Sequence, residues 1–245
     1  GMNALCVQVL GDEAMPGSVH ALFDAAEAIG RGLRERLAID FWRLLNRQIG
    51  SVHDQPRSLH MAYVARLLDR CAALSGLAAE NMVRGAGWRF LEIGRRLERA
   101  IHICRLVKTF AGDEASAHDL NLLLDLCDCQ ITYRTRYLAG LALDPVRDML
   151  VLEPNNPRSL AFQTDAILAH LQALPSLRDD GMPEPAVQLA LAITARLRAT
   201  DADTLTAVDL DSTERQLLHP SDRINDRFFL KGEDAPRASG MTRLA

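Results

Sequence analysis

The longest stretch of this 245-residue chain without proline runs over residues 57–144, and it constrains the fold more than any other feature. The chain holds ten prolines, and proline ends or kinks a helix when it stands in the interior. Apolar residues within the stretch recur at three- and four-residue steps, which is the spacing of one helix face and not the alternation of a strand. The stretch therefore predicts three long helices.

Three apolar stripes mark these helices. The first covers residues 59–77, and Gly85 and Gly87 supply the turn that follows it. The second stripe covers residues 88–110, and its expected buried face includes Ile93 and Val107. The third covers residues 120–138 and is broad enough to indicate a central helix.

Helices are also expected before this stretch. Ser18 is a candidate N-cap for a helical pattern over residues 19–33. The pattern continues toward Gly50 with a break near Ala38, whereas the first sixteen residues show no clear period.

After the stretch, EPNNPRS (153–159) predicts the start of a helix over residues 160–174. Asn156 can cap this helix because Pro157 would take its first position. Another helix is expected over residues 187–198.

Asp211 and Ser221 are expected to cap two short closing helices, and residues 231–245 to form a polar tail. Because no segment alternates like a strand, the fold class is all-α. We expect a single multi-helix bundle with long antiparallel helices, in one domain over residues 17–230.

Charge and hydropathy exclude several function classes. With 28 Lys and Arg against 32 Asp and Glu, the net charge is −4, which disfavours nucleic-acid binding. No window approaches 18 uninterrupted apolar residues, and the start lacks the pattern of a secretory signal. We therefore expect a cytoplasmic protein that does not insert into a membrane.

The sequence predicts no metal and no cofactor. A di-iron bundle needs Glu-x-x-His on two helices, but only Glu98 and His102 come near this pattern, at i and i+4. Cys127 and Cys129 would lie about 200° apart on a helix, so they cannot share one zinc ion and are expected in the core. Gly30-x-Gly32 follows no strand and lacks the third glycine of a dinucleotide fingerprint.

Charged residues of the second expected helix form a candidate cluster. Glu98 has Arg95 one turn before it and His102 one turn after it, while Glu92 can reach Arg95 or Arg96. Two interpretations stay open, a solvated helix face with surface ion pairs or a charged cluster inside the bundle.

The third expected helix carries ITYRTRY (131–137). If it is an antiparallel neighbour of the second helix, four of its side chains could face Glu98 and Arg99. These four are Tyr133, Arg134, Arg136 and Tyr137. Arginine suits a partly buried carboxylate because its planar guanidinium group can donate two parallel hydrogen bonds.

The sequence GWRFLEIGRRLERA (87–100) resembles the signature of the alpha-E domain, a bacterial all-helical family named for its Glu-Arg motif, here Glu98-Arg99. AIGRGLRERLAIDFWRLLN (28–46) is similar to an earlier family segment. The agreement continues in ITYRTRY (131–137), PVRDMLVLEPNNPRSLAFQ (145–163) and SDRINDRFF (221–229). The family's usual first helix has no counterpart, so the domain resembles an N-terminally truncated form.

This resemblance implies association with circularly permuted ATP-grasp ligase-like proteins and with transglutaminase-like peptidases, in peptide synthesis or modification. It provides no established catalytic residue. The motif or possible ligand-binding positions are Arg95, Glu98, Arg99, Tyr133, Arg134, Arg136, Tyr137, Asn156 and Arg158.

Two hypotheses about function follow. In the first, the chain is a non-catalytic partner or scaffold of an ATP-grasp-like peptide ligase. In the second, it is an enzyme or substrate-holding subunit whose arginines bind a carboxylate or phosphate, while Glu98 or Tyr137 handles protons. The second requires these side chains to meet in a pocket.

Overall fold

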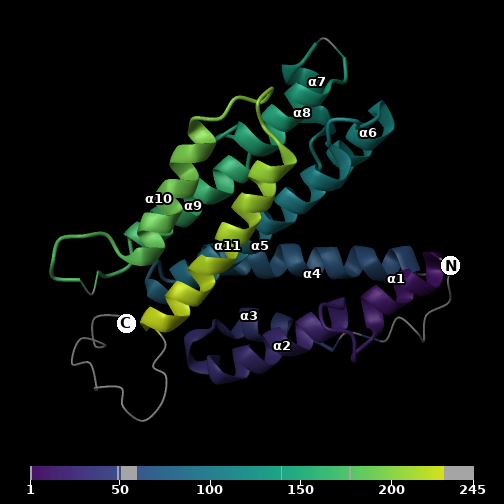
Figure 1. Cartoon of the computed structure of the whole chain (residues 1–245). Helices are drawn as coiled ribbons and strands as arrows, with labels where there is room; N and C mark the ends of the chain where they lie inside the picture. The colour runs from purple at the N-terminus through teal and green to yellow at the C-terminus, as the bar shows by residue number, and fades with distance from the viewer. Residues whose placement is uncertain (1, 49, 51–59, 139, 177, 229–245) are drawn as a thin grey trace. The chain divides into compact units, whose positions relative to one another are not determined.

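A computed structural model of the chain describes residues 2–48, 50, 60–138, 140–176 and 178–228. In this part of the chain all regular elements are helices and no strand is present (Figure 1), which confirms the all-α prediction. The helices form two compact units, Gly1–Arg84 and Gly85–Ala245. Each unit buries a hydrophobic cluster of its own, which is why the chain divides there.

Four α-helices and one 3-10 turn lie in the described residues of the first unit. Ser18 Oγ accepts a hydrogen bond from Ala21 N at 3.1 Å, so its prediction as an N-cap is confirmed, and the expected break falls at Ala38. The first helix was not predicted because its apolar residues do not follow a helical period. The elements are α1 (Met2–Gly11), α2 (Val19–Gly32), η1 (Arg34–Arg36), α3 (Ile39–Leu45) and α4 (His60–Asn81).

Gly30 lets α2 pack closely against α3. A Cβ atom at this buried position would lie 2.6 Å from Leu45 Cδ2 and 3.2 Å from Trp42 Cζ3. Gly30 of this GxG sequence is thus explained by helix packing.

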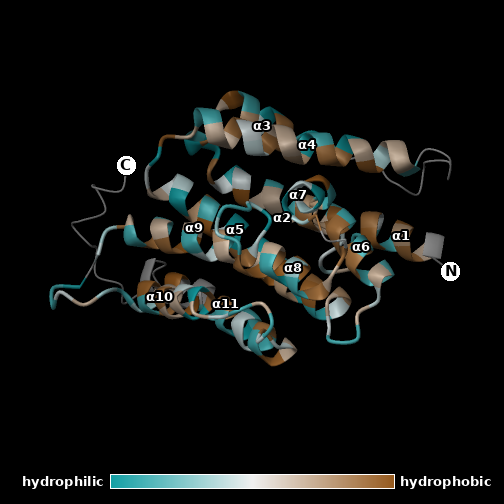
Figure 2. Cartoon of the chain, turned by 90° about the horizontal axis from the view of Figure 1, so that it is seen from above, coloured by the Kyte–Doolittle hydropathy of each residue, from teal (hydrophilic) through white to brown (hydrophobic). Residues whose placement is uncertain are grey.

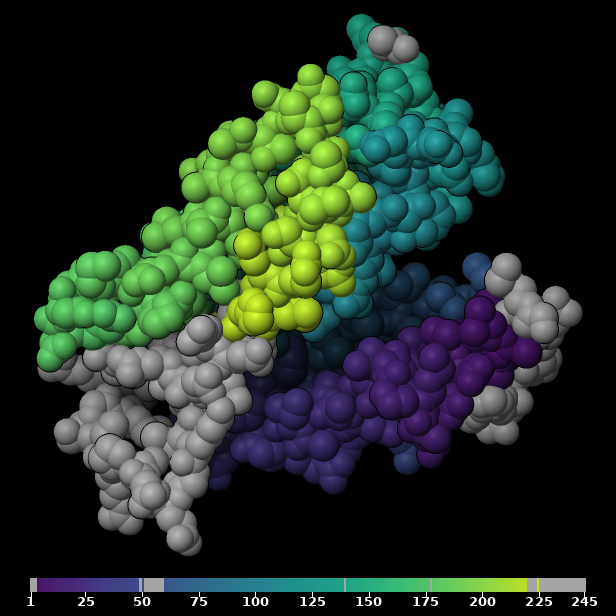
Figure 3. Space-filling model, in the orientation of Figure 1, coloured from purple at the N-terminus to yellow at the C-terminus, as the bar shows by residue number. Residues whose placement is uncertain are grey.

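The second unit is organised around α5 (Ala86–Phe110), which packs against α9 (Leu160–Gln172) and α11 (Ala207–Phe228). The helix α10 (Pro185–Arg198) packs against both α9 and α11. Figure 2 shows hydrophilic and hydrophobic residues alternating around these helices, and in Figure 3 α10 and α11 form one continuous surface. The predicted face of α5 is buried from Ile93 to Val107. The other elements are α6 (Ala117–Leu126), α7 (Gln130–Arg136), α8 (Leu143–Arg147) and a π-helical turn (Asp148–Leu152).

The single helix expected over residues 120–138 is broken into α6 and α7. Asp128 has a φ of +52°, a left-handed conformation that cannot continue a helix. Cys129 N donates to Leu124 O at 2.9 Å across this break. The prediction of one long central helix is therefore wrong.

The two short closing helices are in fact one helix, α11, which continues past Pro220. Thr206 Oγ1 accepts a hydrogen bond from Asp209 N at 3.2 Å and so fixes the start of the helix before Asp211. Leu217 and Ile224 are both buried in the core, and this packing holds the two halves in one helix.

The polar tail expected at residues 231–245 lies outside the described ranges. Within those ranges, none of the helices is both long and apolar enough to cross a membrane.

Candidate functional site

The Glu98-Arg99 motif lies at a pocket of about 330 Å³ in the second unit. Two sequence segments far apart in the chain, 87–100 and 145–163, meet at this pocket. The lining residues are Glu98, Arg99, His102, Ile103 and Leu106 from α5, Leu126 and Cys127 at the end of α6, and Pro157, Arg158 and Gln163 around the start of α9.

Three ionisable side chains of α5 are available to a ligand at this pocket. Glu98, Arg99 and His102 are all exposed, and none makes a hydrogen bond or an ion pair with any residue of the described ranges. Neighbouring positions such as i and i+1 point in different directions around a helix, so Glu98 and Arg99 do not neutralise each other. Of the two interpretations of this cluster, the structure shows an exposed face for Glu98 and Arg99.

Positive charge is concentrated around Arg99. Partial burial and the like charges of Arg95, Arg96 and Arg158 lower the pKa of the Arg99 guanidinium. Arginine remains charged at neutral pH even so. A negative group placed next to Arg99 would reduce this repulsion between like charges.

Asn156 shapes the loop that carries Arg158, although it does not cap the helix as predicted. The cap of α9 is Ser159, whose Oγ accepts a hydrogen bond from Phe162 N at 3.0 Å. Asn156 is buried, its Oδ1 accepts from Arg158 N at 3.0 Å, and its Nδ2 donates to Met149 O at 2.9 Å. The asparagine thus stabilises the turn before the helix.

Gln163 ties the same loop to α5. Its Oε1 accepts a hydrogen bond from Arg96 Nη1 at 3.2 Å, and its Nε2 donates to Pro157 O at 2.6 Å. Arg158 is exposed and reaches Asp128 Oδ2 at 3.3 Å. These bonds hold the backbone at Arg158 beside the pocket, while the side chain of Arg158 is exposed.

Arg95 is not part of the pocket, because it pairs with the buried carboxylate of Glu92. Glu92 also contacts Arg96 Nη2 at 3.4 Å. Burial raises the pKa of Glu92, but the hydrogen bond and charge of Arg95 and the charge of Arg96 outweigh it, so the net pKa lies below the ordinary value. Glu92 lies on the same face of α5 as the buried Ala100 and Ile103. This helical spacing could have predicted from the sequence that Glu92 is buried.

The four candidate side chains of residues 131–137 do not gather at this pocket. Tyr133 OH donates to Gly140 O at 2.9 Å and accepts from Ala142 N at 3.1 Å. Tyr137 OH donates to Asp148 Oδ2 at 2.5 Å, Arg136 pairs with Glu153 and Asp148, and Arg134 is exposed. Instead of facing Glu98 and Arg99, the two tyrosines and Arg136 bind residues 140–153, because the break at Asp128 separates their helix from α6.

We expect Tyr133→Phe to lower the free energy of unfolding of the second unit by about 1–3 kcal/mol. The ring would stay in place, while the Gly140 carbonyl and the Ala142 amide would lose their partner. Urea unfolding measures the loss. Thr135→Ala removes an exposed hydroxyl of the same helix and is the control; equal losses for both variants would contradict the assignment.

Within the described ranges, no three His, Cys, Asp or Glu side chains come together as a metal site requires. Cys127 and Cys129 are buried free thiols. Burial raises the pKa of Cys127 to about 12, so this thiol stays protonated at neutral pH although it lines the pocket.

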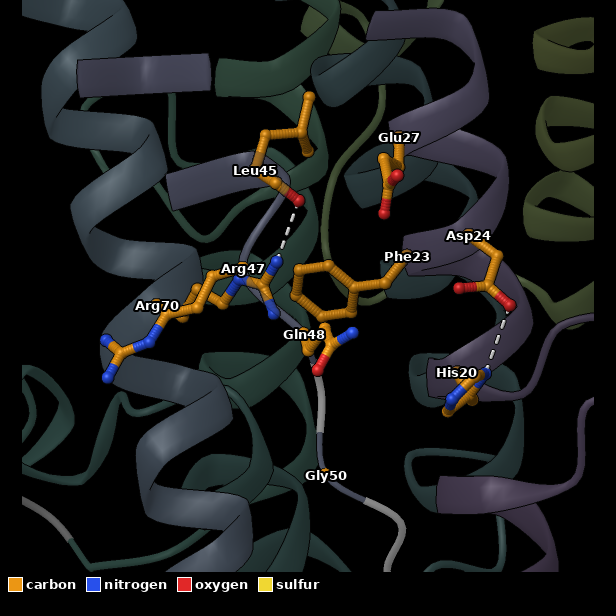
Figure 4. A pocket seen from close by; sticks show the side chains of 9 residues that line it. All are labelled: His20, Phe23, Asp24, Glu27, Leu45, Arg47, Gln48, Gly50 and Arg70. Atoms are coloured by element: carbon orange, nitrogen blue, oxygen red, sulfur yellow. Dashed lines mark hydrogen bonds and ion pairs between the residues drawn. The ribbon is translucent and has the colours of Figure 1, made fainter. Parts of the chain in front are cut away.

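A second pocket, of about 280 Å³, lies in the first unit (Figure 4). One of its two arginines has a structural role, because Arg70 donates to Leu44 O at 3.0 Å and Leu45 O at 2.8 Å and lies 4.5 Å above the Phe23 ring. None of the predicted site residues lies in this pocket. It is lined by His20, Phe23, Asp24, Glu27, Leu45, Arg47, Gln48, Gly50 and Arg70.

Comparison with known families matches residues 2–229 to a family described as a predicted alpha-helical domain with a conserved ER motif. An uncharacterised protein of Mycobacterium bovis is 28% identical over 219 residues, which cover 84% of this chain and 24% of that protein. Uncharacterised proteins from two strains of Mycobacterium tuberculosis are 28% and 27% identical with the same coverage. The chain spans about a quarter of the length of these curated relatives. No solved structure matches it.

Proposed function

The chain belongs to the Alpha-E family, and from this membership and the pocket at its Glu-Arg motif we propose that it is a binding module for a carboxylate or phosphate group. One observation carries the proposal. Glu98 and Arg99 line the pocket, and neither is bound to another residue of the described part of the chain.

Two guanidinium groups from different segments support the binding of an anion. Arg99 lies on the long helix α5. Arg158 lies on a loop whose backbone is hydrogen-bonded to the side chains of Asn156 and Gln163. Charge-assisted hydrogen bonds from arginine to a carboxylate or phosphate are among the stronger polar contacts in proteins. Binding an anion requires no proton transfer. Tyr137, which the sequence offered beside Glu98 as a residue that could transfer protons, is hydrogen-bonded to Asp148.

Titration with acetate and with inorganic phosphate, followed by amide chemical shifts, tests this proposal. We expect shifts around residues 98–103 and 157–163 with at least one of these probes, and about tenfold weaker binding in Arg99→Gln. Arg134→Gln is the matched control, because Arg134 is an exposed arginine of the same unit outside the pocket. Binding that Arg99→Gln leaves unchanged would contradict the proposal.

A second function, as a scaffold for an ATP-grasp-like peptide ligase or a transglutaminase-like peptidase, is compatible with the first. The observation that favours it is the length of the mycobacterial relatives, of which the matched region is only 24%. In those proteins the domain is therefore joined to much more sequence. Failure of this chain to co-purify with a folded ATP-grasp-like partner or with a folded transglutaminase-like peptidase encoded beside it would count against this function.

A further inference from the structure

We infer that the pocket at Glu98-Arg99 takes a small aliphatic molecule that carries both a carboxylate and an ammonium group, such as an aliphatic amino acid or a short aliphatic peptide. This inference rests on the proposed function and specifies its ligand. It depends on three properties of the pocket, which are its charge, its apolar wall and its size.

The charges of the pocket fit a zwitterion better than a phosphate. Among the lining residues, Arg99 and Arg158 supply two positive charges and Glu98 supplies a negative one. Outside the lining, Asp128 already neutralises part of the charge of Arg158, at 3.3 Å. Glu98 would repel a phosphate dianion, because no residue of the described ranges neutralises it. An ammonium group would pair with Glu98 while the carboxylate pairs with the arginines.

One wall of the pocket is apolar. Ile103 and Cys127 are buried, Leu106 is half-buried, and Leu126 remains 54% exposed despite its aliphatic side chain. An alkyl group of the ligand would remove part of this surface from water, which is favourable. The wall therefore selects for an aliphatic side chain on the ligand.

The size and lining of the pocket favour a small ligand without an aromatic base. A volume of about 330 Å³ is at the lower end of the range for small-molecule sites, roughly 300–1,000 Å³. No Phe, Tyr or Trp is among the lining residues, so a nucleotide base would lack the aromatic surface on which bases commonly stack.

Binding of four probes to the full chain tests the charge and the apolar wall separately. They are L-leucine, 4-methylpentanoate (which lacks the ammonium group), glycine (which lacks the alkyl group) and inorganic phosphate. We expect L-leucine to bind about tenfold more tightly than each of the other three. The affinity for leucyl-leucine is then compared with that for L-leucine. The probe that binds more tightly shows whether the ligand is a short peptide or a free amino acid.

Two variants assign the contacts. Glu98→Gln should remove the preference for L-leucine over 4-methylpentanoate, and Leu126→Ser should reduce the preference for L-leucine over glycine. Both side chains are exposed, so the fold should be retained, and Arg134→Gln should leave both preferences unchanged.

The results distinguish the two proposals. If phosphate or 4-methylpentanoate binds as tightly as L-leucine and Arg99→Gln weakens that binding, the anion site is supported and the zwitterion is rejected. If no probe binds in a way that depends on Arg99, the proposed function itself is overturned. A preference for L-leucine that persists in Glu98→Gln also rejects the inference.

Discussion

Glu92→Gln is expected to lower the free energy of unfolding of the second unit by about 3–5 kcal/mol, because it leaves two partly buried arginines without their counter-charge. The Glu92 side chain is 5% exposed and pairs with Arg95 and Arg96. For a unit of this size, each kcal/mol shifts the thermal midpoint by roughly 2–4 °C. The midpoint should therefore fall by about 6–20 °C.

Tryptophan fluorescence can follow the second unit alone. The chain has two tryptophans, and Trp42→Phe leaves Trp88, in α5, as the only reporter. Glu98→Gln in the same background is the matched control, since it changes an exposed glutamate of the same helix and should cost less than about 0.5 kcal/mol. Equal losses for Glu92→Gln and Glu98→Gln would show that the buried pair has no special role.

The effect of Glu92 should also depend on pH. Its pKa in the folded state lies below the ordinary value of 4.5, so its contribution to stability is fully present above that value. The contribution is lost as the pH falls through the folded-state pKa, where the carboxylate becomes protonated in both states. Unfolding curves of the parent and Glu92→Gln should therefore converge at low pH, and a difference that stays constant below pH 4.5 would contradict this.

Arg147→Met should cost the second unit about 2–4 kcal/mol, because hydrogen bonds from charged groups contribute more than neutral ones. Arg147 is 5% exposed, and its Nε donates to Ala111 O at 3.0 Å. Its Nη2 donates to Asp113 Oδ1 at 2.7 Å. The arginine thus satisfies a carbonyl at the end of α5, where the helix dipole favours a positive charge.

Two further variants test the role of Arg147. Arg147→Lys should restore only part of the stability, because a single ammonium group cannot reproduce the planar geometry of the guanidinium donors. Arg134→Met removes an exposed arginine and should leave the urea midpoint unchanged. If Arg147→Met unfolds at the same urea concentration as the parent chain, the contact with the end of α5 is not stabilising.

Helices with a regular apolar period could be predicted from the sequence, and α5 is the clearest case. Its buried face from Ile93 to Val107 was expected from spacing alone. The break at Asp128 could not be predicted in this way, because aspartate adopts a left-handed conformation only when the surrounding structure requires it. The single helix through Pro220 likewise depends on the burial of Leu217 and Ile224.

The residues of the site could be listed from the sequence, but their grouping could not. Glu98, Arg99 and Arg158 meet at one pocket, whereas Tyr133 and Arg136 stabilise residues 140–153. Which side chain of a charged helix becomes buried depends on the elements that pack against it. For that reason the buried carboxylate is that of Glu92, although the Glu-Arg motif directs attention to Glu98.

The hydrogen bonds of Gln163 have a consequence for the thermodynamics of binding. They join Arg96, which pairs with Glu92 in the interior, to the backbone of the loop that carries Arg158. This loop does not have to become ordered when a ligand arrives. The conformational entropy that a free loop would lose on binding has already been lost on folding, so more of the contact energy remains for affinity.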